Sequence, residues 1–127
     1  MDKFAGLRLG DCFLVAAGSG LGGVARYVLS LWLMSRFPSA FPWGILWVNV
    51  TGCLLLGLLM GWIAGRGDFN AWRLFLGVGF LGGYTTFSTL LYDTWRLGGR
   101  LGLANLGLSA AAGFLATALG HRIVRFF

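Results

Sequence analysis

Hydrophobic residues occur in four long runs that are separated by short polar segments. The runs cover residues 12–33, 43–64, 74–92 and 101–120. Each is close to the roughly 20 residues that an α-helix needs to cross the hydrocarbon core of a bilayer. The segments between them are RFPSAFP, GRGDFNAWR and RLGGR, which contain prolines, glycines and charges. We therefore expect an all-α membrane protein with four transmembrane helices that form a single domain over residues 1–127.

The composition supports this interpretation. Of the 127 residues, 57% are hydrophobic, 11% are charged and 22 are glycines. This balance is typical of an integral membrane protein and lies outside the range of ordinary soluble domains. Lys3 and Arg8 precede an apolar stretch, as in a secretory signal, but that stretch continues past any cleavage site to Leu33. We expect it to be a transmembrane span of the mature protein.

The net charge of +6 does not indicate a nucleic-acid partner, because the basic residues flank the spans instead of clustering on one face. The alternation of spans and loops divides them between the two sides of the membrane. One side receives Lys3, Arg8, Arg66, Arg73, Arg122 and Arg125, and the other receives Arg36, Arg96 and Arg100. This asymmetry is modest for short loops, so the orientation is weakly specified and favours cytoplasmic termini.

Few side chains are available for catalysis. The acids are Asp2, Asp11, Asp68 and Asp93, and the one histidine is His121. Cys12 and Cys53 fall within the apolar runs, where small packing residues are expected. No nucleophile–base pair, carboxylate pair or metal cluster can be assembled from these groups, so we expect a protein that is not an enzyme.

The first span contains GSGLGGVARY, which formally matches the dinucleotide-binding motif G-x-G-x-x-G. That motif requires a preceding strand and a βαβ unit, and neither is predicted here. Gly18 and Gly22 instead predict a close contact between helices. Arg26 follows within the same span, where a charge must face protein, water or the membrane interface. Two interpretations remain open for Arg26, a side chain that reaches the headgroups and a position near an anion entrance.

Polar side chains also occur inside the second and fourth spans. Asn49 in the second span predicts either a hydrogen bond between helices or an amide that faces a polar path. The fourth span carries a stripe at intervals of four residues, which places its members on one helix face. The stripe consists of Asn105, Ser109, Gly113 and Thr117. Alone it is typical of a tight helix contact; together with Asn49 it favours a pathway.

The third span contains GGYTTFSTL, in which a Gly–Gly pair precedes a run of hydroxyl side chains. Glycines weaken a helix, and a break within a bilayer is tolerated only where the freed backbone groups are buried in protein or line a cavity. Such breaks offer carbonyls to cations, and N–H groups or hydroxyls to anions. We expect Gly82–Thr85 to be unwound. The alternative is a continuous helix whose glycines pack and whose threonine hydroxyls donate to the carbonyls four residues earlier.

Three motifs occur in order along the chain: GSGLGGVARY in the first span, GILWVNVTGCLLLG in the second and GFLGGYTTFST in the third. Together they resemble the Fluc/CrcB fluoride channels of bacterial membranes. Length, number of spans and motif order agree, and the resemblance covers essentially the whole chain. The third-span motif is its specific part.

The resemblance implies a dual-topology homodimer in the bacterial inner membrane, with two antiparallel subunits whose broken third helices cross at the centre. It also implies a structural Na⁺ held by the backbone carbonyls of Gly82 and Thr85 from both subunits. Two fluoride pores would run antiparallel, with Asn49 as the motif asparagine and Phe87 as the first pore phenylalanine.

Fluoride is small and tightly hydrated, so its pore must replace water with donors of its own. The Asn49 amide, the hydroxyls of Ser88 and Thr89 and the electropositive ring edge of Phe87 have this character. The chain departs from the family at Leu90, where a second phenylalanine is usual, and in the fourth-span stripe, where the family carries a tyrosine and serines. We include Leu90, Asn105, Ser109, Thr117 and Arg26 in the expected pathway.

The expected function is passive, fluoride-selective efflux from the cytoplasm, which protects the cell from fluoride. One alternative is a four-helix transporter of the small multidrug type, which needs an intramembrane carboxylate, whereas Asp11 and Asp93 occur only at span ends. The other is a membrane assembly subunit without a transport role. It would account for the packing glycines but not for Asn49 together with a hydroxyl-rich break.

Overall fold

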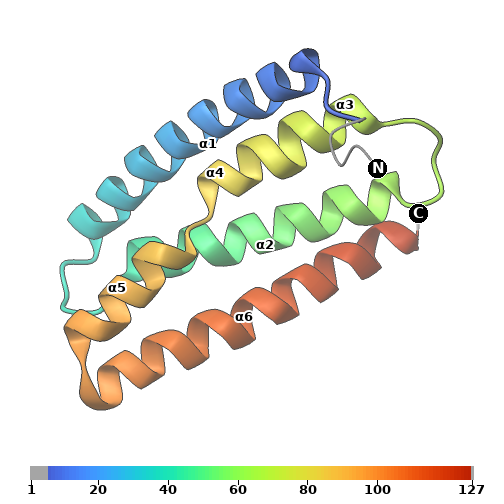
Figure 1. The fold of residues 1–127 in the computed structure, drawn as a ribbon. Coiled ribbons are helices and arrows are strands. Elements are labelled where there is room, and N and C mark those ends of the chain that lie inside the picture. Colours follow the sequence, from blue (N-terminus) through green and yellow to red (C-terminus); the bar gives the residue numbers. More distant parts are fainter. Residues whose placement is uncertain (1–5, 127) are drawn as a thin grey trace.

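The computed structural model describes residues 6–126, and these form four antiparallel helical spans (Figure 1). Helix α1 is Leu9–Arg36, α2 is Trp43–Ile63 and α6 is Gly99–Arg125. The third span runs from Asn70 to Leu97. It is built from α3 (Asn70–Trp72), the π-helix η1 (Arg73–Leu81), α4 (Gly82–Tyr84) and α5 (Phe87–Leu97). All four spans are long and apolar enough to cross a membrane, which confirms the predicted all-α, multi-pass fold class.

The third span packs against different helices before and after its break. Helix α1 packs along η1 and α4, whereas α2 packs chiefly along α6. After the break the chain continues as α5, which packs against α6 (Figure 1). The break therefore carries the third span from one helix pair to the other.

Glycines allow the backbone of α1 to lie close to the third span. A Cβ atom at Gly18 would lie 2.8 Å from the Phe80 nitrogen, and one at Gly22 would lie 2.9 Å from the Tyr84 nitrogen. Real Cβ atoms do not approach backbone atoms this closely, so a larger side chain would force the helices apart. The predicted close contact at Gly18 and Gly22 is confirmed.

The break in the third span lies later than the glycine pair predicted. Gly82, Gly83 and Tyr84 are helical, and the backbone becomes extended at Thr85 (φ −81°, ψ 156°) and Thr86 (φ −148°, ψ 116°). The expectation that Gly82–Thr85 is unwound is therefore wrong for its first three residues. Gly83 has a packing role instead, because a Cβ atom there would lie 2.9 Å from the Ser19 Cα atom.

The segment before the break is a π-helix, which the sequence pattern did not predict. Residues Arg73–Leu81 form nine π-helical positions, and the N–H of Gly82, which follows this segment, donates to the carbonyls of both Gly77 and Gly79. Both glycines are buried against neighbouring helices. Long π-helical segments are rare and are found preferentially at functional sites, so the third span is unusual before the break as well as at it.

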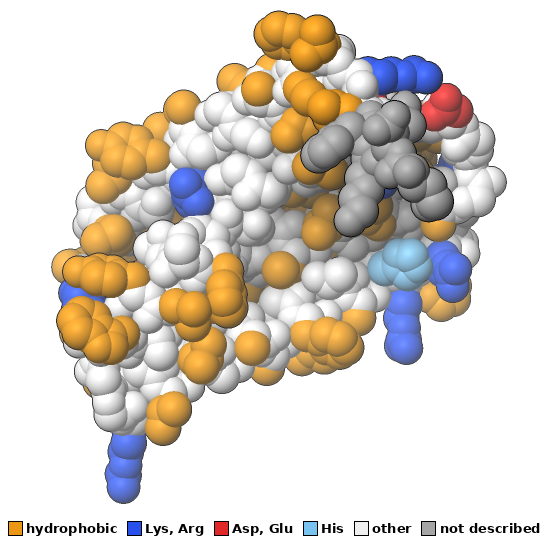
Figure 2. Space-filling model, viewed as in Figure 1, with side chains coloured by type: hydrophobic (Ala, Val, Ile, Leu, Met, Phe, Trp, Pro, Cys, Tyr) orange, Lys and Arg blue, Asp and Glu red, His pale blue; other side chains and the backbone are white. Residues whose placement is uncertain are grey.

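Many large apolar side chains are exposed on the described surface, as expected for a chain surrounded by lipid. Large side chains such as Phe13, Trp95 and Phe114 are at least 74% exposed, and hydrophobic side chains are spread over the face seen in Figure 2. Charged side chains lie mainly at the two ends of the bundle. Arg8, Arg66, Arg73, Arg122 and Arg125 occur at one end of the spans and Arg36, Arg96 and Arg100 at the other, as predicted; Lys3 lies outside the described residues.

The glycine contact generates a prediction about folding. Gly22→Val should destabilise the protein by about 1–3 kcal/mol, because its side chain would overlap the backbone of the third span. Gly20→Val is the matched control, since a Cβ atom at Gly20 meets nothing within 4 Å. Thermal unfolding of both purified variants in detergent provides the measurement. Equal melting temperatures for the two variants would contradict the proposed contact.

Candidate functional site

The Asn49 side chain holds the broken segment of the third span. Its Oδ1 atom accepts a hydrogen bond of 2.7 Å from the Thr86 backbone N–H, and its Nδ2 atom donates one of 3.0 Å to the Thr86 carbonyl. The amide therefore supplies the acceptor that the Thr86 N–H loses at the break, and it adds a donor to the Thr86 carbonyl. Of the two interpretations of Asn49, the hydrogen bond between helices is the one that the structure contains, and one Nδ2–H remains for another acceptor.

Thr86 starts the helix after the break, a role that the sequence analysis missed. Its hydroxyl accepts from the Thr89 backbone N–H at 3.3 Å and donates to the Thr89 hydroxyl at 3.0 Å. Thr86 is thus the N-cap of α5, and its side chain is 7% exposed. A threonine placed before a new helix is a recognisable capping signal, so the T-F-S-T sequence contained the information.

The break removes the helical N–H donors of the two carbonyls for which the family resemblance implies Na⁺ binding. In a continuous helix the Thr86 N–H would donate to Gly82, and the Thr89 N–H would donate to Thr85. Both N–H groups have other acceptors here, Asn49 Oδ1 and Thr86 Oγ1. Carbonyl oxygens released from a helix suit a cation such as Na⁺, so the residues present fit this group.

Arg26 points inward to the same break. Its guanidinium donates to the Thr85 carbonyl over 3.4 Å, and the side chain is half-buried. This contact does not match a side chain that extends to the headgroups. It places a positive charge beside the extended segment, where it favours anions and competes with a cation for the Thr85 oxygen.

A cavity of about 380 Å³ opens next to the break, between α2, α5 and α6. Five of the predicted pathway residues lie on its wall. They are Asn49, Phe87, Leu90, Ser109 and Thr117, and Cys53 and Phe114 complete its sides. The cavity thus brings together residues from three helices that are separated by as many as 68 positions in sequence, from Asn49 to Thr117.

The donors in this cavity differ in their availability. The Ser109 hydroxyl is buried and has no hydrogen-bond partner in the described structure. The Thr117 hydroxyl, in contrast, donates to the Gly113 carbonyl at 3.0 Å, as a threonine inside a helix often does. Phe87 is 68% exposed, so its ring edge is free for a ligand or a partner. Ser109 and the free N–H of Asn49 are therefore the polar donors that the cavity offers.

Four predicted residues do not line this cavity. Asn105 is fully buried and donates to the Thr94 hydroxyl at 3.0 Å, so it joins α6 to α5. Ser88 is exposed and lies 3.3 Å from the Thr86 hydroxyl. Arg26 contacts the break from the side of α1. Thr89 lines a second cavity of about 490 Å³, together with Ser30, Asp93 and Arg96. Their place in the pathway stays a prediction.

The side chains around the cavity are suited to binding and releasing a small ion. Among residues 6–126, no three His, Cys, Asp or Glu side chains come together in a way that could hold a metal ion. The cavity instead presents an amide, a hydroxyl and a phenyl ring on apolar walls. Such a surface can replace the hydration of a small anion while binding it weakly enough to release it.

Comparison with known proteins identifies the family. The family model described as "CrcB-like protein, Camphor Resistance (CrcB)" matches residues 13–121. A protein of Symbiobacterium thermophilum named "Fluoride-specific ion channel FluC 2" is 48% identical over 114 residues, which cover 86% of this chain and 93% of the relative. Proteins named "Fluoride-specific ion channel FluC" from Acidobacterium capsulatum and Rhizobium meliloti are 45% and 43% identical. The aligned parts cover 84% and 87% of this chain, and 89% and 96% of those relatives. The chain belongs to the CrcB family of membrane proteins.

Proposed function

We propose that this protein is a fluoride-selective ion channel that lets F⁻ leave the cytoplasm passively. Relatives that are 43–48% identical over most of their length bear the name of fluoride-specific ion channels. The observation in this chain that carries the proposal is the cavity beside the break, where the Ser109 hydroxyl is buried without a partner. A buried donor without an acceptor is costly, and an anion would supply the missing acceptor.

The donor set explains why fluoride would be preferred. F⁻ has a high charge density and holds water strongly, so it enters only where donors replace that water at short range. Asn49 and Ser109 supply N–H and O–H groups, and Phe87 supplies the positive edge of an aromatic ring. Chloride is larger and gains less from so narrow a set of donors. Leu90 lies on the same wall and makes it more apolar without adding a donor.

We infer that the functional unit is an antiparallel homodimer with Na⁺ at its centre. One protomer offers the carbonyls of Gly82 and Thr85 at the break, the second of which also accepts from Arg26, and Gly82 lies on the exposed side of the helix. A second copy that packs there would contribute the same two oxygens and enclose the cation. Na⁺ would supply a fixed positive charge at the point where the broken third spans of the two protomers cross.

The charge distribution is compatible with insertion in both directions. Five described arginines lie at one end of the bundle and three at the other, a small difference for the positive-inside rule. The proposed location is the inner membrane of a bacterium. There an inside-negative potential favours exit of an anion by about 2.3 kcal/mol per charge per 100 mV.

Two other functions account for less of the structure. A small multidrug-type transporter requires an acid within the spans, but Asp93 lies near the end of α5 and pairs with Arg96 at 3.4 Å. An assembly subunit without transport would need the glycine contacts but not the unpaired Ser109 hydroxyl in a cavity. The channel alone uses the break, the cavity and the free donors together.

A flux measurement tests the function directly. Liposomes that contain the purified protein and internal fluoride should release F⁻ far faster than protein-free vesicles, and chloride-loaded vesicles should release very little Cl⁻. A fluoride electrode records the first rate and a chloride electrode the second. Fluoride release no faster than from empty vesicles, or chloride release at the same rate, would rule out a fluoride-selective channel.

The role of Ser109 can be separated from its contribution to folding. Ser109→Ala should reduce fluoride flux roughly tenfold or more, because a hydrogen bond to a charged group contributes about 1.5–3 kcal/mol. Its melting temperature should not fall, since the hydroxyl has no partner to lose among the described residues. Ser35→Ala is the control, because that exposed hydroxyl already donates to the Trp32 carbonyl. Wild-type flux in Ser109→Ala would remove Ser109 from the pathway.

Labelling in intact cells tests the antiparallel assembly. In a chain with Cys12 and Cys53 replaced by serine, Ala64→Cys and Ser39→Cys place one thiol at opposite ends of the bundle. If both orientations are inserted, a membrane-impermeant maleimide should label about half of the copies of each variant. Complete labelling of one variant and none of the other would show a single orientation and contradict the proposed dimer.

A further inference from the structure

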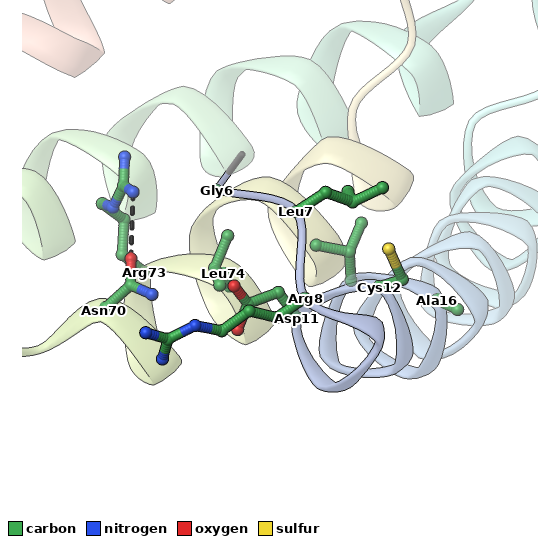
Figure 3. Close-up of a pocket in the computed structure, with 10 residues that line it drawn as sticks. Gly6, Leu7, Arg8, Asp11, Cys12, Ala16, Asn70, Arg73 and Leu74 are labelled. Carbon is green, nitrogen blue, oxygen red and sulfur yellow. Dashed lines mark hydrogen bonds between the residues drawn. The ribbon is translucent and has the colours of Figure 1, made fainter. Parts of the chain in front are cut away.

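A cavity of about 590 Å³ lies far from the break, at the end of the bundle where α1 begins (Figure 3). Its walls come from the start of α1, the residues that precede it and the start of the third span. Neither the proposed fluoride path nor the dimer crossing uses any of these residues. The chemistry of this cavity therefore needs an explanation of its own.

The cavity changes from polar to apolar along α1. Arg8, Asp11, Asn70 and Arg73 gather at one part of it, whereas Cys12 and Ala16 lie further along the helix (Figure 3). Val15 and Leu74 complete the apolar wall. From Leu9 to Ala16 this wall extends about 10 Å into the span, at 1.5 Å per residue. The polar end thus lies at the membrane boundary and the apolar end within the hydrocarbon.

The two arginines of the cavity keep their charge available. Within residues 6–126 the only ion pair closer than 4 Å is Arg96 with Asp93, at the other end of the bundle. Arg73 donates to the neutral Oδ1 of Asn70 at 3.0 Å, which orients the guanidinium without neutralising it. Both arginine side chains are exposed. With Asp11 included, the described wall carries a formal charge of +1, from two arginines and one aspartate.

We propose that this cavity binds an anionic phospholipid, with the phosphate diester at Arg8 and Arg73 and an acyl chain along Cys12, Val15 and Ala16. Basic pockets between transmembrane helices are known to receive such headgroups. A guanidinium binds phosphate oxygens through paired N–H groups, and two guanidinium groups surround a diester better than one. A soluble ion would make no favourable contact with the apolar wall, whereas an acyl chain would.

Asp11 selects among the possible phosphates. Its carboxylate repels a second negative charge, so a diester with one charge fits better than dianionic inorganic phosphate. A headgroup that ends in hydroxyls can also donate to this carboxylate. Phosphatidylglycerol has both properties, and its single negative charge balances the +1 charge of the wall. The occupant that the cavity favours is therefore a lipid of this type.

The test measures lipid binding to the full-length protein in detergent by native mass spectrometry, with phosphatidylglycerol, phosphatidylcholine and inorganic phosphate as probes. The Arg8→Gln/Arg73→Gln variant should bind phosphatidylglycerol roughly ten- to thirtyfold more weakly than the wild type, because two basic contacts are lost. The matched control is Arg66→Gln/Arg125→Gln. It removes two charges from the same end of the bundle outside the cavity, and should change the affinity less than about threefold.

Further outcomes decide the matter. The Arg8→Lys/Arg73→Lys variant keeps both charges and should bind phosphatidylglycerol within about threefold of the wild type, which separates lost charge from lost folding. Equal weakening in both glutamine variants would overturn the proposal, and so would equal binding of phosphatidylcholine or of inorganic phosphate by the wild type. Fluoride flux should be retained in the Arg8→Gln/Arg73→Gln variant. A wild-type protein without flux would refute the channel but leave the lipid proposal untouched, because lipid binding is measured separately.

Discussion

The pair of hydrogen bonds between the Asn49 amide and the Thr86 backbone is the contact on which the rest of the structure depends. In lipid, each backbone N–H and C=O needs a partner within the protein, so an interrupted helix is tolerated only where other groups take the place of its own turns. Asn49 supplies a donor and an acceptor from one side chain, at 3.0 Å and 2.7 Å. Because the amide is planar and rigid, it also sets how α2 lies against the third span.

Once the break is stabilised, the third span can serve two helix pairs. Its first half follows α1 closely because Gly18, Gly22 and Gly83 have no side chains to separate the backbones. Its second half leaves α1 and packs on α6, where Asn105 bonds to Thr94. The change of partner at the break leaves a cavity between α2, α5 and α6, because a straight third span would have continued along α1. The cavity is thus a consequence of the break.

Hydrogen-bond satisfaction also separates structural polar groups from those that are free to act. Thr51 bonds to the Tyr84 hydroxyl at 2.9 Å, Thr117 bonds to its own helix, and Thr86 caps α5. These groups stabilise the fold and have little left to offer a ligand. The Ser109 hydroxyl and the Asn105 Oδ1 atom are different because both are buried and unpaired among the described residues, and of these two residues Ser109 lines the cavity. A polar group that the fold leaves unsatisfied at a membrane-embedded cavity is the best local sign of a transported ion.

The sequence by itself determined the four spans, the close contact at Gly18 and Gly22 and the importance of Asn49. Hydrophobic length, the absence of a side chain and the burial of an amide are local properties that each leave a local signal. Only the tertiary structure decided that the break falls at Thr85 and Thr86 instead of at the glycine pair. It also placed Ser109 in the cavity and Asn105 outside it, although both belong to one stripe. The reason is that helix propensity differs little between adjacent glycines and threonines, whereas the partners of a broken backbone and the walls of a cavity come from helices distant in sequence.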